Sequence, residues 1–105
     1  MEVLPLTAPW FVYLLRCADG SLYVGISNDV AHRIKTHNSG RGARYTRMRG
    51  PGGLAWQCYA GSQSRAIRLE RLIKQCTHAQ KEMLIAGELA YVLAQTHPSG
   101  RFFHL

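Results

Sequence analysis

One acidic residue, Glu70, stands out because it lies on the apolar side of a predicted helix over residues 65–75. At about 100° per residue, the side chains that share its arc are apolar: Ala66, Ile67, Leu69, Leu72 and Ile73. A carboxylate facing the interior needs a cationic partner, a metal ion or a proton, because an unpaired buried charge is costly. The alternative is a glutamate at the edge of the stripe that pairs with an arginine.

Arg33 and His37 lie four residues apart on a second predicted helix, over residues 29–38, and therefore share one face. A guanidinium matches the oxygens of a phosphate, and an imidazole donates a hydrogen bond or moves a proton. The alternative is a solvated surface pair. Lys35 points elsewhere on this helix and is expected to contribute only positive charge to nucleic-acid binding.

Tyr13 and Tyr23 lie on two predicted strands, residues 10–17 and 21–26, which are rich in aromatic and β-branched residues. A two-residue loop between these strands would put the two phenols on opposite faces of the sheet. A three-residue loop over residues 18–20, with Gly20 left-handed, pairs residues whose numbers sum to 38 and puts both phenols on one face. This register is predicted because it also collects an apolar opposite face: Val12, Leu14, Leu22 and Val24.

A glycine-rich and arginine-rich segment follows the helix at residues 29–38. Its cations and its aromatic residue are Arg41, Arg44, Arg47, Arg49 and Tyr45. Phosphate contacts combined with base stacking are how such a loop would bind a nucleic acid. The alternative is a solvated surface loop, which would leave the lack of compensating acids unexplained.

The length of the chain limits the number of domains, and its charge limits the classes of binding partner. Its 105 residues, 47% hydrophobic, fit one domain and exclude a second. Thirteen Lys and Arg against six Asp and Glu give a net charge of +7, so the partner is expected to be a nucleic acid, an anionic membrane surface or an acidic protein. Eight of the cations lie between Arg33 and Arg68, with no acid among them, directly before Glu70.

The remaining composition favours a cytoplasmic protein with reduced thiols. The apolar run at residues 8–15 is too short to span a bilayer, and Glu2 stands where a signal peptide would carry basic residues. The three cysteines form no pair with the spacing of a zinc site or of a disulfide framework. They are Cys17, Cys58 and Cys76.

The other elements are predicted from patterns and caps. A third strand fits residues 54–59, Ser62 or Ser64 caps the helix at 65–75, and Thr77 with Gln80 forms a capping box for a last helix ending near Gly87. The helix at 29–38 is expected to be capped by Ser27 or Asn28 and to bury Val30 and Ile34. Residues 88–105 could extend the last helix or add an edge strand.

The order of the elements, ββαβαα, predicts an α+β fold with a small, mainly antiparallel three-stranded sheet flanked by helices. We expect one domain over residues 9–87, with residues 88–105 as its C-terminal extension.

The order and spacing of these motifs resemble the GIY-YIG nuclease superfamily, and in particular its small stand-alone bacterial members. The matching motifs are V-Y-L-L at 12–15, Y-V-G at 23–25, Arg33 ten residues after Tyr23, H-N-S-G-R-G-A-R-Y-T-R from His37, and a glutamate on a later helix. The resemblance covers roughly residues 9–86. Phe11 and Val12 replace the Gly-Ile of the first family motif, and the chain has no Asn after Asn38.

The resemblance implies a role for each matching residue. Tyr13 and Tyr23 would be the paired active-site tyrosines, and Gly25 the glycine that closes the second motif. Arg33 would bind the scissile phosphate with the help of His37, and Glu70 would bind a single Mg²⁺ or Mn²⁺.

The implied function is a metal-dependent endonuclease that hydrolyses phosphodiester bonds in DNA. Branched and single-stranded DNA of repair or recombination are candidate substrates, and either tyrosine could be the general base. Two alternatives stay open: a nucleic-acid-binding module that has lost turnover, and a protein-interaction domain whose charge only keeps it soluble.

Overall fold

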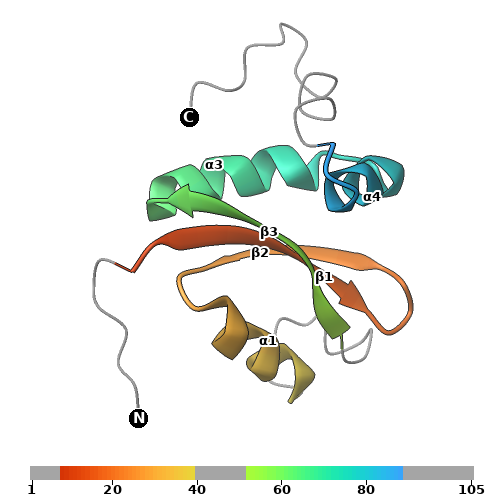
Figure 1. The fold of residues 1–105 in the computed structure, drawn as a ribbon, viewed down its shortest axis with the longest axis horizontal. Helices are drawn as coiled ribbons and strands as arrows, with labels where there is room; N and C mark the ends of the chain where they lie inside the picture. The colour runs from red at the N-terminus through yellow and green to blue at the C-terminus, as the bar shows by residue number, and fades with distance from the viewer. Residues whose placement is uncertain (1–7, 40–51, 89–105) are drawn as a thin grey trace, which may run out of the picture.

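The computed structural model describes residues 8–39 and 52–88, and in these ranges the elements follow one another in the order ββαβαα (Figure 1). The elements are β1 (Trp10–Cys17), β2 (Leu22–Ser27), α1 (Val30–Asn38), β3 (Gly52–Gly61), α3 (Gln63–Lys74) and α4 (His78–Ile85). This order is the predicted one.

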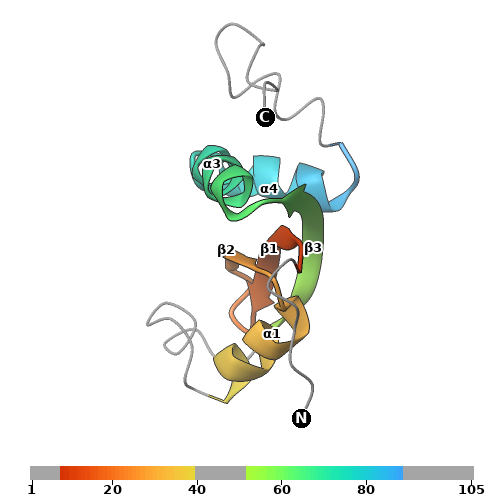
Figure 2. The ribbon, with the colours of Figure 1, turned by 90° about the vertical axis from the view of Figure 1, so that its left-hand side faces the viewer.

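The strands form an antiparallel sheet in the order β2-β1-β3. Helix α1 covers one face of this sheet, and α3 and α4 cover the other, as both ribbon views show (Figures 1 and 2). The α+β architecture with helices on both sides of a small sheet is therefore confirmed.

The β1–β2 hairpin has the predicted register. Tyr13 lies opposite Gly25, and Leu15 lies opposite Tyr23. The turn is closed by a hydrogen bond of 2.9 Å that the backbone N–H of Gly20 donates to the carbonyl of Cys17, and Gly20 has a φ of +87°. A positive φ is easily reached only by glycine, so Gly20 makes this three-residue turn possible.

The apolar face of the hairpin builds the hydrophobic core against α3 and α4. Its buried members are Val12, Leu14, Val24, Ala60, Ala66, Leu69, Ile73, Cys76 and Leu84. The opposite face of the sheet, under α1, carries Tyr13 and Tyr23. Two-residue alternation along each strand separates these two sets of side chains.

The helix caps agree with the predictions at α3 and α4 but not at α1. Ser62 accepts a hydrogen bond from the N–H of Arg65, and Thr77 forms its capping box with Gln80. For α1, the predicted cap at Ser27 or Asn28 was wrong, because the carboxylate of Asp29 accepts from the N–H of His32 at 3.2 Å. Ser27 instead accepts from the N–H of Asp29 at 2.8 Å, which positions this cap.

Strand β3 is longer than the predicted segment at residues 54–59. Its first residue, Gly52, pairs with Cys17 and also makes two hydrogen bonds with the side chain of Asn38. Asn38 donates to the Gly52 carbonyl at 2.9 Å and accepts from its N–H at 2.8 Å. The end of α1 is thus joined to the start of β3 by an amide that satisfies both backbone groups of Gly52.

Several predictions fall outside the described residues. They concern the loop residues Arg41, Arg44, Tyr45, Arg47 and Arg49, and the C-terminal segment 89–105. Among the helices of the described ranges, none is both long and apolar enough to cross a membrane. The three cysteines are free thiols, two of them buried and Cys58 half-buried.

Candidate active site

Three aromatic rings from three elements meet on the face of the sheet that α1 covers. Tyr13 of β1, Tyr23 of β2 and His37 of α1 form this ring cluster. The ring centroids of Tyr23 and His37 are 5.2 Å apart, those of Tyr13 and His37 are 6.3 Å apart, and those of the two tyrosines are 6.5 Å apart. The hairpin register brings the tyrosines together, and α1 adds the imidazole.

His37 is the one fully buried side chain of α1, with 3% of its surface exposed. The alternative of a solvated surface pair with Arg33 is therefore wrong for His37. Its Nε2 lies 3.0 Å from the hydroxyl of Tyr13, which is itself completely buried. Val30 and Ile34, which were expected on the buried side of α1, are only half-buried.

Burial keeps both members of this hydrogen-bonded pair uncharged. Burial raises the pKa of Tyr13 to about 12, Tyr23 adds to the rise, and Arg33 partly offsets it. Burial lowers the pKa of His37 below its usual value of 6.5, and the positive charge of Arg33 lowers it further. At neutral pH the pair is thus a neutral phenol beside a neutral imidazole, a combination that can shift a proton without creating a lasting buried charge.

Arg33 is exposed on α1 and acts electrostatically on the whole ring cluster. For Tyr23, burial raises the pKa and the charge of Arg33 opposes that rise. A guanidinium at the edge of a cluster of neutral rings is well placed to bind a phosphate while its own charge stays hydrated.

Glu70 lies on the opposite side of the sheet from the ring cluster and acts on the tyrosines through its charge. It lies on α3, its side chain is 18% exposed, and its carboxylate is 3.6 Å from the ammonium of Lys74. The negative charge of Glu70 raises the pKa of both Tyr13 and Tyr23. Glu70 is therefore half-buried and paired with a cation, which is closer to the alternative of a glutamate at the edge of the apolar stripe, although the partner is a lysine one turn away and not an arginine.

The edge strand β2 contacts helices on both faces of the sheet. Tyr23 lines one pocket together with Lys74 and Lys81 of the α3–α4 layer, while its ring also contacts His37 of α1. Lys74 could have been noted from the sequence because it lies four residues after Glu70. Lys81 could not, because only the packing of α4 brings it to Tyr23. Lys35, predicted to add charge, is exposed on α1.

A single carboxylate is available to a metal ion at this site. Among the described residues, no group of three or more His, Cys, Asp or Glu is arranged to hold a metal. Glu70 alone suits a hard divalent ion that keeps most of its ligands as water, since Mg²⁺ is commonly bound through one or two carboxylates. The loose ion pair with an exposed lysine leaves the carboxylate free to exchange partners.

Gly25 makes room for Tyr13, and Gly25→Ala is expected to destabilise the fold. An added Cβ would lie 2.5 Å from the hydroxyl oxygen of Tyr13. Because Tyr13 is fully buried, we expect a cost of about 1–3 kcal/mol, the usual cost of overpacking. Thermal unfolding of the variant measures this cost as a lower Tm.

Gly53→Ala is the matched control, because a Cβ at Gly53 would meet no atom within 4 Å. Equal Tm values for the two alanine variants would contradict a packing role for Gly25.

Comparison with known proteins assigns the chain to a family. Residues 9–83 match the family described as GIY-YIG catalytic domain. A UPF0213 protein of Cronobacter sakazakii is 48% identical over 89 residues, which cover 85% of this chain and 94% of that protein. A UPF0213 protein of Vibrio cholerae is also 48% identical over 89 residues, covering 83% of this chain and 88% of that protein.

One solved structure is also similar to this chain in sequence. The solution NMR structure of a UPF0213 protein from Bacillus halodurans is 38% identical to this chain, covers 91% of it and 95% of its own chain, and has a TM-score of 0.48. The family match spans both strands of the tyrosine hairpin, α1 and the helix of Glu70. The chain belongs to the GIY-YIG catalytic-domain family, as its motifs predicted, and is related to the small bacterial UPF0213 proteins.

Proposed function

We propose that this protein is a metal-dependent endonuclease that hydrolyses phosphodiester bonds in DNA. The observation that carries the proposal is the buried hydrogen bond between Tyr13 and His37 within the ring cluster, beside the exposed guanidinium of Arg33. Membership in the GIY-YIG family supports a nuclease activity and a nucleic-acid substrate.

The proposed chemistry divides between proton transfer and charge neutralisation. With its proton on Nδ1, His37 accepts a hydrogen bond from the Tyr13 hydroxyl. The phenol can then take a proton from the attacking water while it passes its own proton to His37, so that no free phenolate has to form in the buried site. This concerted shift is needed because burial raises the pKa of Tyr13 to about 12 and lowers that of His37, so that a stepwise transfer would create two unfavourable charges.

Arg33 would bind the scissile phosphate and neutralise the negative charge that grows on it. Glu70 would hold one divalent ion, which supplies Lewis-acid stabilisation of the leaving oxygen when it is bound. Tyr23 lies at the half-exposed side of the ring cluster and would orient the phosphate or the attacking water.

A cleavage screen tests the proposal directly. Purified protein is incubated with single-stranded, duplex and branched DNA and with matched RNA, in Mg²⁺, in Mn²⁺ and in a chelator. We expect strand cleavage of at least one DNA form that requires the divalent ion. Binding to these nucleic acids without any metal-dependent cleavage would instead support a binding module that has lost turnover.

The pH dependence of cleavage should follow His37. Because burial and Arg33 lower the pKa of His37 below 6.5, its neutral form persists into mildly acidic solution. If His37 accepts the proton of Tyr13, kcat/KM stays constant near neutrality and falls only below pH 6.5, as the imidazole becomes protonated. A pH–rate profile from acidic to neutral pH measures this fall.

His37→Gln should remove the acidic fall and lower the plateau, whereas His32→Gln, on the exposed side of α1, should change neither. An acidic fall that persists unchanged in His37→Gln would assign the titration to another group.

A further inference from the structure

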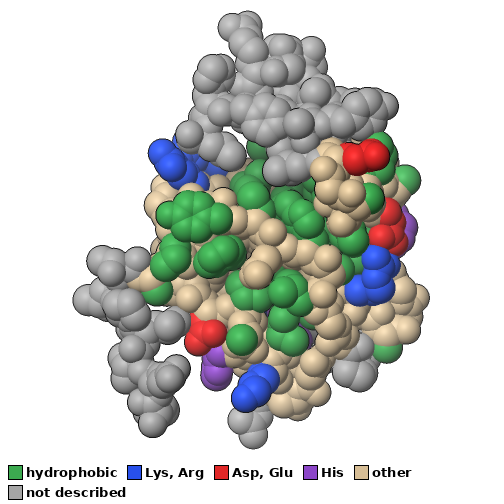
Figure 3. All heavy atoms as spheres, viewed as in Figure 1, with side chains coloured by type: hydrophobic (Ala, Val, Ile, Leu, Met, Phe, Trp, Pro, Cys, Tyr) green, Lys and Arg blue, Asp and Glu red, His purple; other side chains and the backbone are tan. Residues whose placement is uncertain are grey.

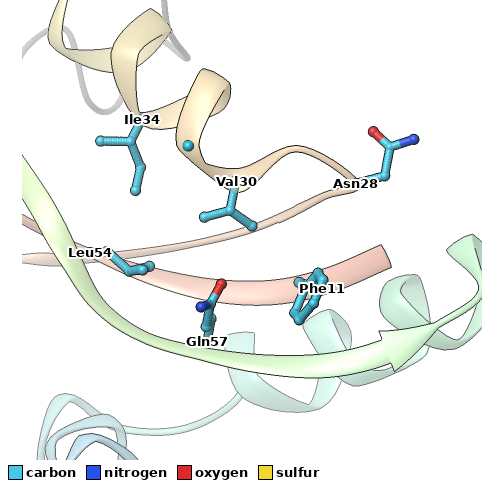
Figure 4. Close-up of a pocket in the computed structure, with 7 residues that line it drawn as sticks. Phe11, Asn28, Val30, Ile34, Leu54 and Gln57 are labelled. Atoms are coloured by element: carbon cyan, nitrogen blue, oxygen red, sulfur yellow. The ribbon is translucent and has the colours of Figure 1, made fainter. Parts of the chain in front are cut away.

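A pocket lies on the same face of the sheet as the ring cluster, but over β1 and β3 instead of β1 and β2. It has a volume of about 420 Å³ and opens to solvent between α1 and the sheet (Figure 4). Its lining residues are Phe11, Asn28, Val30, Ala31, Ile34, Leu54 and Gln57. We refer to it as the Phe11–Gln57 pocket.

The walls of the Phe11–Gln57 pocket combine apolar surfaces with two amides and carry no charge. Val30 and Ile34 point from α1 toward the sheet, where Phe11 and Leu54 face them (Figure 4). The amide of Gln57 lies between Phe11 and Leu54 (Figure 4). Together with Asn28, it offers both hydrogen-bond donors and acceptors.

Apolar surface continues from this pocket onto the exposed edge of the sheet. Leu54 is 43% exposed and Tyr59 is 66% exposed. The ring of Tyr59 packs edge-to-face against that of Phe11, with the ring centroids 5.7 Å apart. Hydrophobic side chains are visible on the face of the molecule that carries β3 (Figure 3). A flat ring that is apolar on its faces and polar at its edge would match such walls, and a nucleobase has this character.

The register of the sheet makes the pocket a direct neighbour of the ring cluster. Gln57 of β3 lies directly opposite Tyr13 of β1, so their side chains are neighbours on one face of the sheet. Phe11 lies two residues before Tyr13 and projects to the same face. A nucleotide strand bound at the ring cluster would therefore have a neighbouring base within reach of Gln57.

We propose that the Phe11–Gln57 pocket binds the base of an unpaired nucleotide next to the cleaved phosphate, a proposal that rests on the proposed nuclease function. A base enters only when it is unstacked and unpaired, because its faces must contact Phe11 and the aliphatic walls while its edge meets the amides. The pocket thus selects single-stranded or locally opened substrate over continuous duplex. The pocket would bind one unpaired base and would not recognise a longer base sequence.

The test compares oligonucleotides with and without bases, in a chelator so that no cleavage occurs. Fluorescence anisotropy gives the Kd for a short thymidine oligomer, for the same sugar-phosphate backbone without bases, and for a duplex. Gln57→Ala and, separately, Phe11→Leu should weaken binding of the thymidine oligomer about tenfold, as expected for the loss of one base contact. Binding of the abasic backbone and of the duplex should stay unchanged.

Gln63→Ala is the matched control, because Gln63 is exposed on α3, outside the pocket lining. Gln57 is exposed as well, so its replacement is not expected to impair folding, and thermal unfolding confirms this for each variant. Equal weakening of all three ligands, no weakening of the thymidine oligomer, or no binding of that oligomer to the unmodified protein would each overturn the proposal.

Oligomeric state and cleavage distinguish a base site from a dimer contact and from a failure of the nuclease function. A shift from dimer to monomer in Gln57→Ala or Phe11→Leu, measured by analytical ultracentrifugation, would overturn the proposal and assign the surface to a second copy of the chain. Base-dependent binding without any metal-dependent cleavage would overturn the nuclease function but keep the base site. Cleavage with no difference between pocket variants and control would overturn the base site alone.

Discussion

Tyr13→Phe is expected to abolish most cleavage while leaving the fold and DNA binding nearly intact. The phenyl ring keeps the packing of a residue that is fully buried, and only the hydroxyl that bonds to His37 is lost. Because a positioned acid or base contributes about 10²–10⁴-fold to a rate, we expect kcat to fall by that factor. Single-turnover cleavage measures the chemical step without product release.

The stability cost of Tyr13→Phe should be small by comparison. The change removes one hydrogen bond of His37, and a single hydrogen bond contributes about 0.5–1.5 kcal/mol to stability. A lower Tm is therefore expected, but the protein should remain folded at the assay temperature. Unchanged affinity for an uncleaved DNA in chelator would show that the binding surface is intact.

Tyr59→Phe is the matched control, since it removes only an exposed hydroxyl outside the ring cluster and keeps the ring that packs against Phe11. Its cleavage rate should stay close to that of the unmodified protein. Tyr23→Phe distinguishes the two tyrosines: a larger loss in Tyr23→Phe than in Tyr13→Phe would make Tyr23 the general base and refute the Tyr13–His37 pair in that role.

Glu70→Gln is expected to remove metal-dependent cleavage by losing the one carboxylate at the site. The glutamine keeps the size of the side chain but has no charge for a divalent ion, so the rate should fall by at least about 100-fold, a loss of a few kcal/mol of transition-state stabilisation. The fold should persist, because the pair with Lys74 is loose and such partly exposed pairs contribute about 0–1 kcal/mol. Cleavage assays across Mg²⁺ and Mn²⁺ concentrations measure the loss.

Direct Mn²⁺ binding gives a second readout for Glu70 that does not depend on turnover. Electron paramagnetic resonance should detect bound Mn²⁺ in the unmodified protein and much less in Glu70→Gln. Spectroscopic titration should also show lower pKa values for Tyr13 and Tyr23 in the variant, because the negative charge of Glu70 raises both.

Glu82→Gln is the matched control for the change in charge. Glu82 accepts two hydrogen bonds from the guanidinium of Arg16 and forms an ion pair with it, and it also contacts His78 on α4. Its replacement should leave Mn²⁺ binding and cleavage unchanged. If Glu70→Gln retained cleavage within a few fold of this control, Glu70 would not hold the catalytic ion.

The parts of the site that could be predicted were those set by short-range rules. Turn length and the glycine at position 20 determine the hairpin register, so the pairing of Tyr13 with Gly25 followed from a loop of three residues. Helical periodicity likewise placed Glu70 among apolar neighbours and set Arg33 one turn from His37. These relations involve atoms a few residues apart, where backbone geometry leaves few choices.

Local patterns were less reliable where several groups compete for one contact. Ser27, Asn28 and Asp29 are all suitable helix caps, and only the hydrogen bond from Asp29 to Ser27 decides among them. On α1 the apolar pair Val30 and Ile34 was expected to be buried, yet His37 is the buried residue. The contact of His37 with Tyr13 depends on how α1 lies across the sheet, which periodicity within α1 does not specify.

The amino-acid sequence by itself determined the order of the elements, the face shared by the tyrosines and the types of side chain available for phosphate chemistry. The tertiary structure alone decided that α1 and α3 lie on opposite faces of the sheet and both contact the edge strand β2, and that the charges of Arg33 and Glu70 act on the same two tyrosines. It also decided that Gln57 lies opposite Tyr13. The physical reason is that these contacts join residues far apart in the chain, and their geometry follows from burying the two faces of one sheet against different helices.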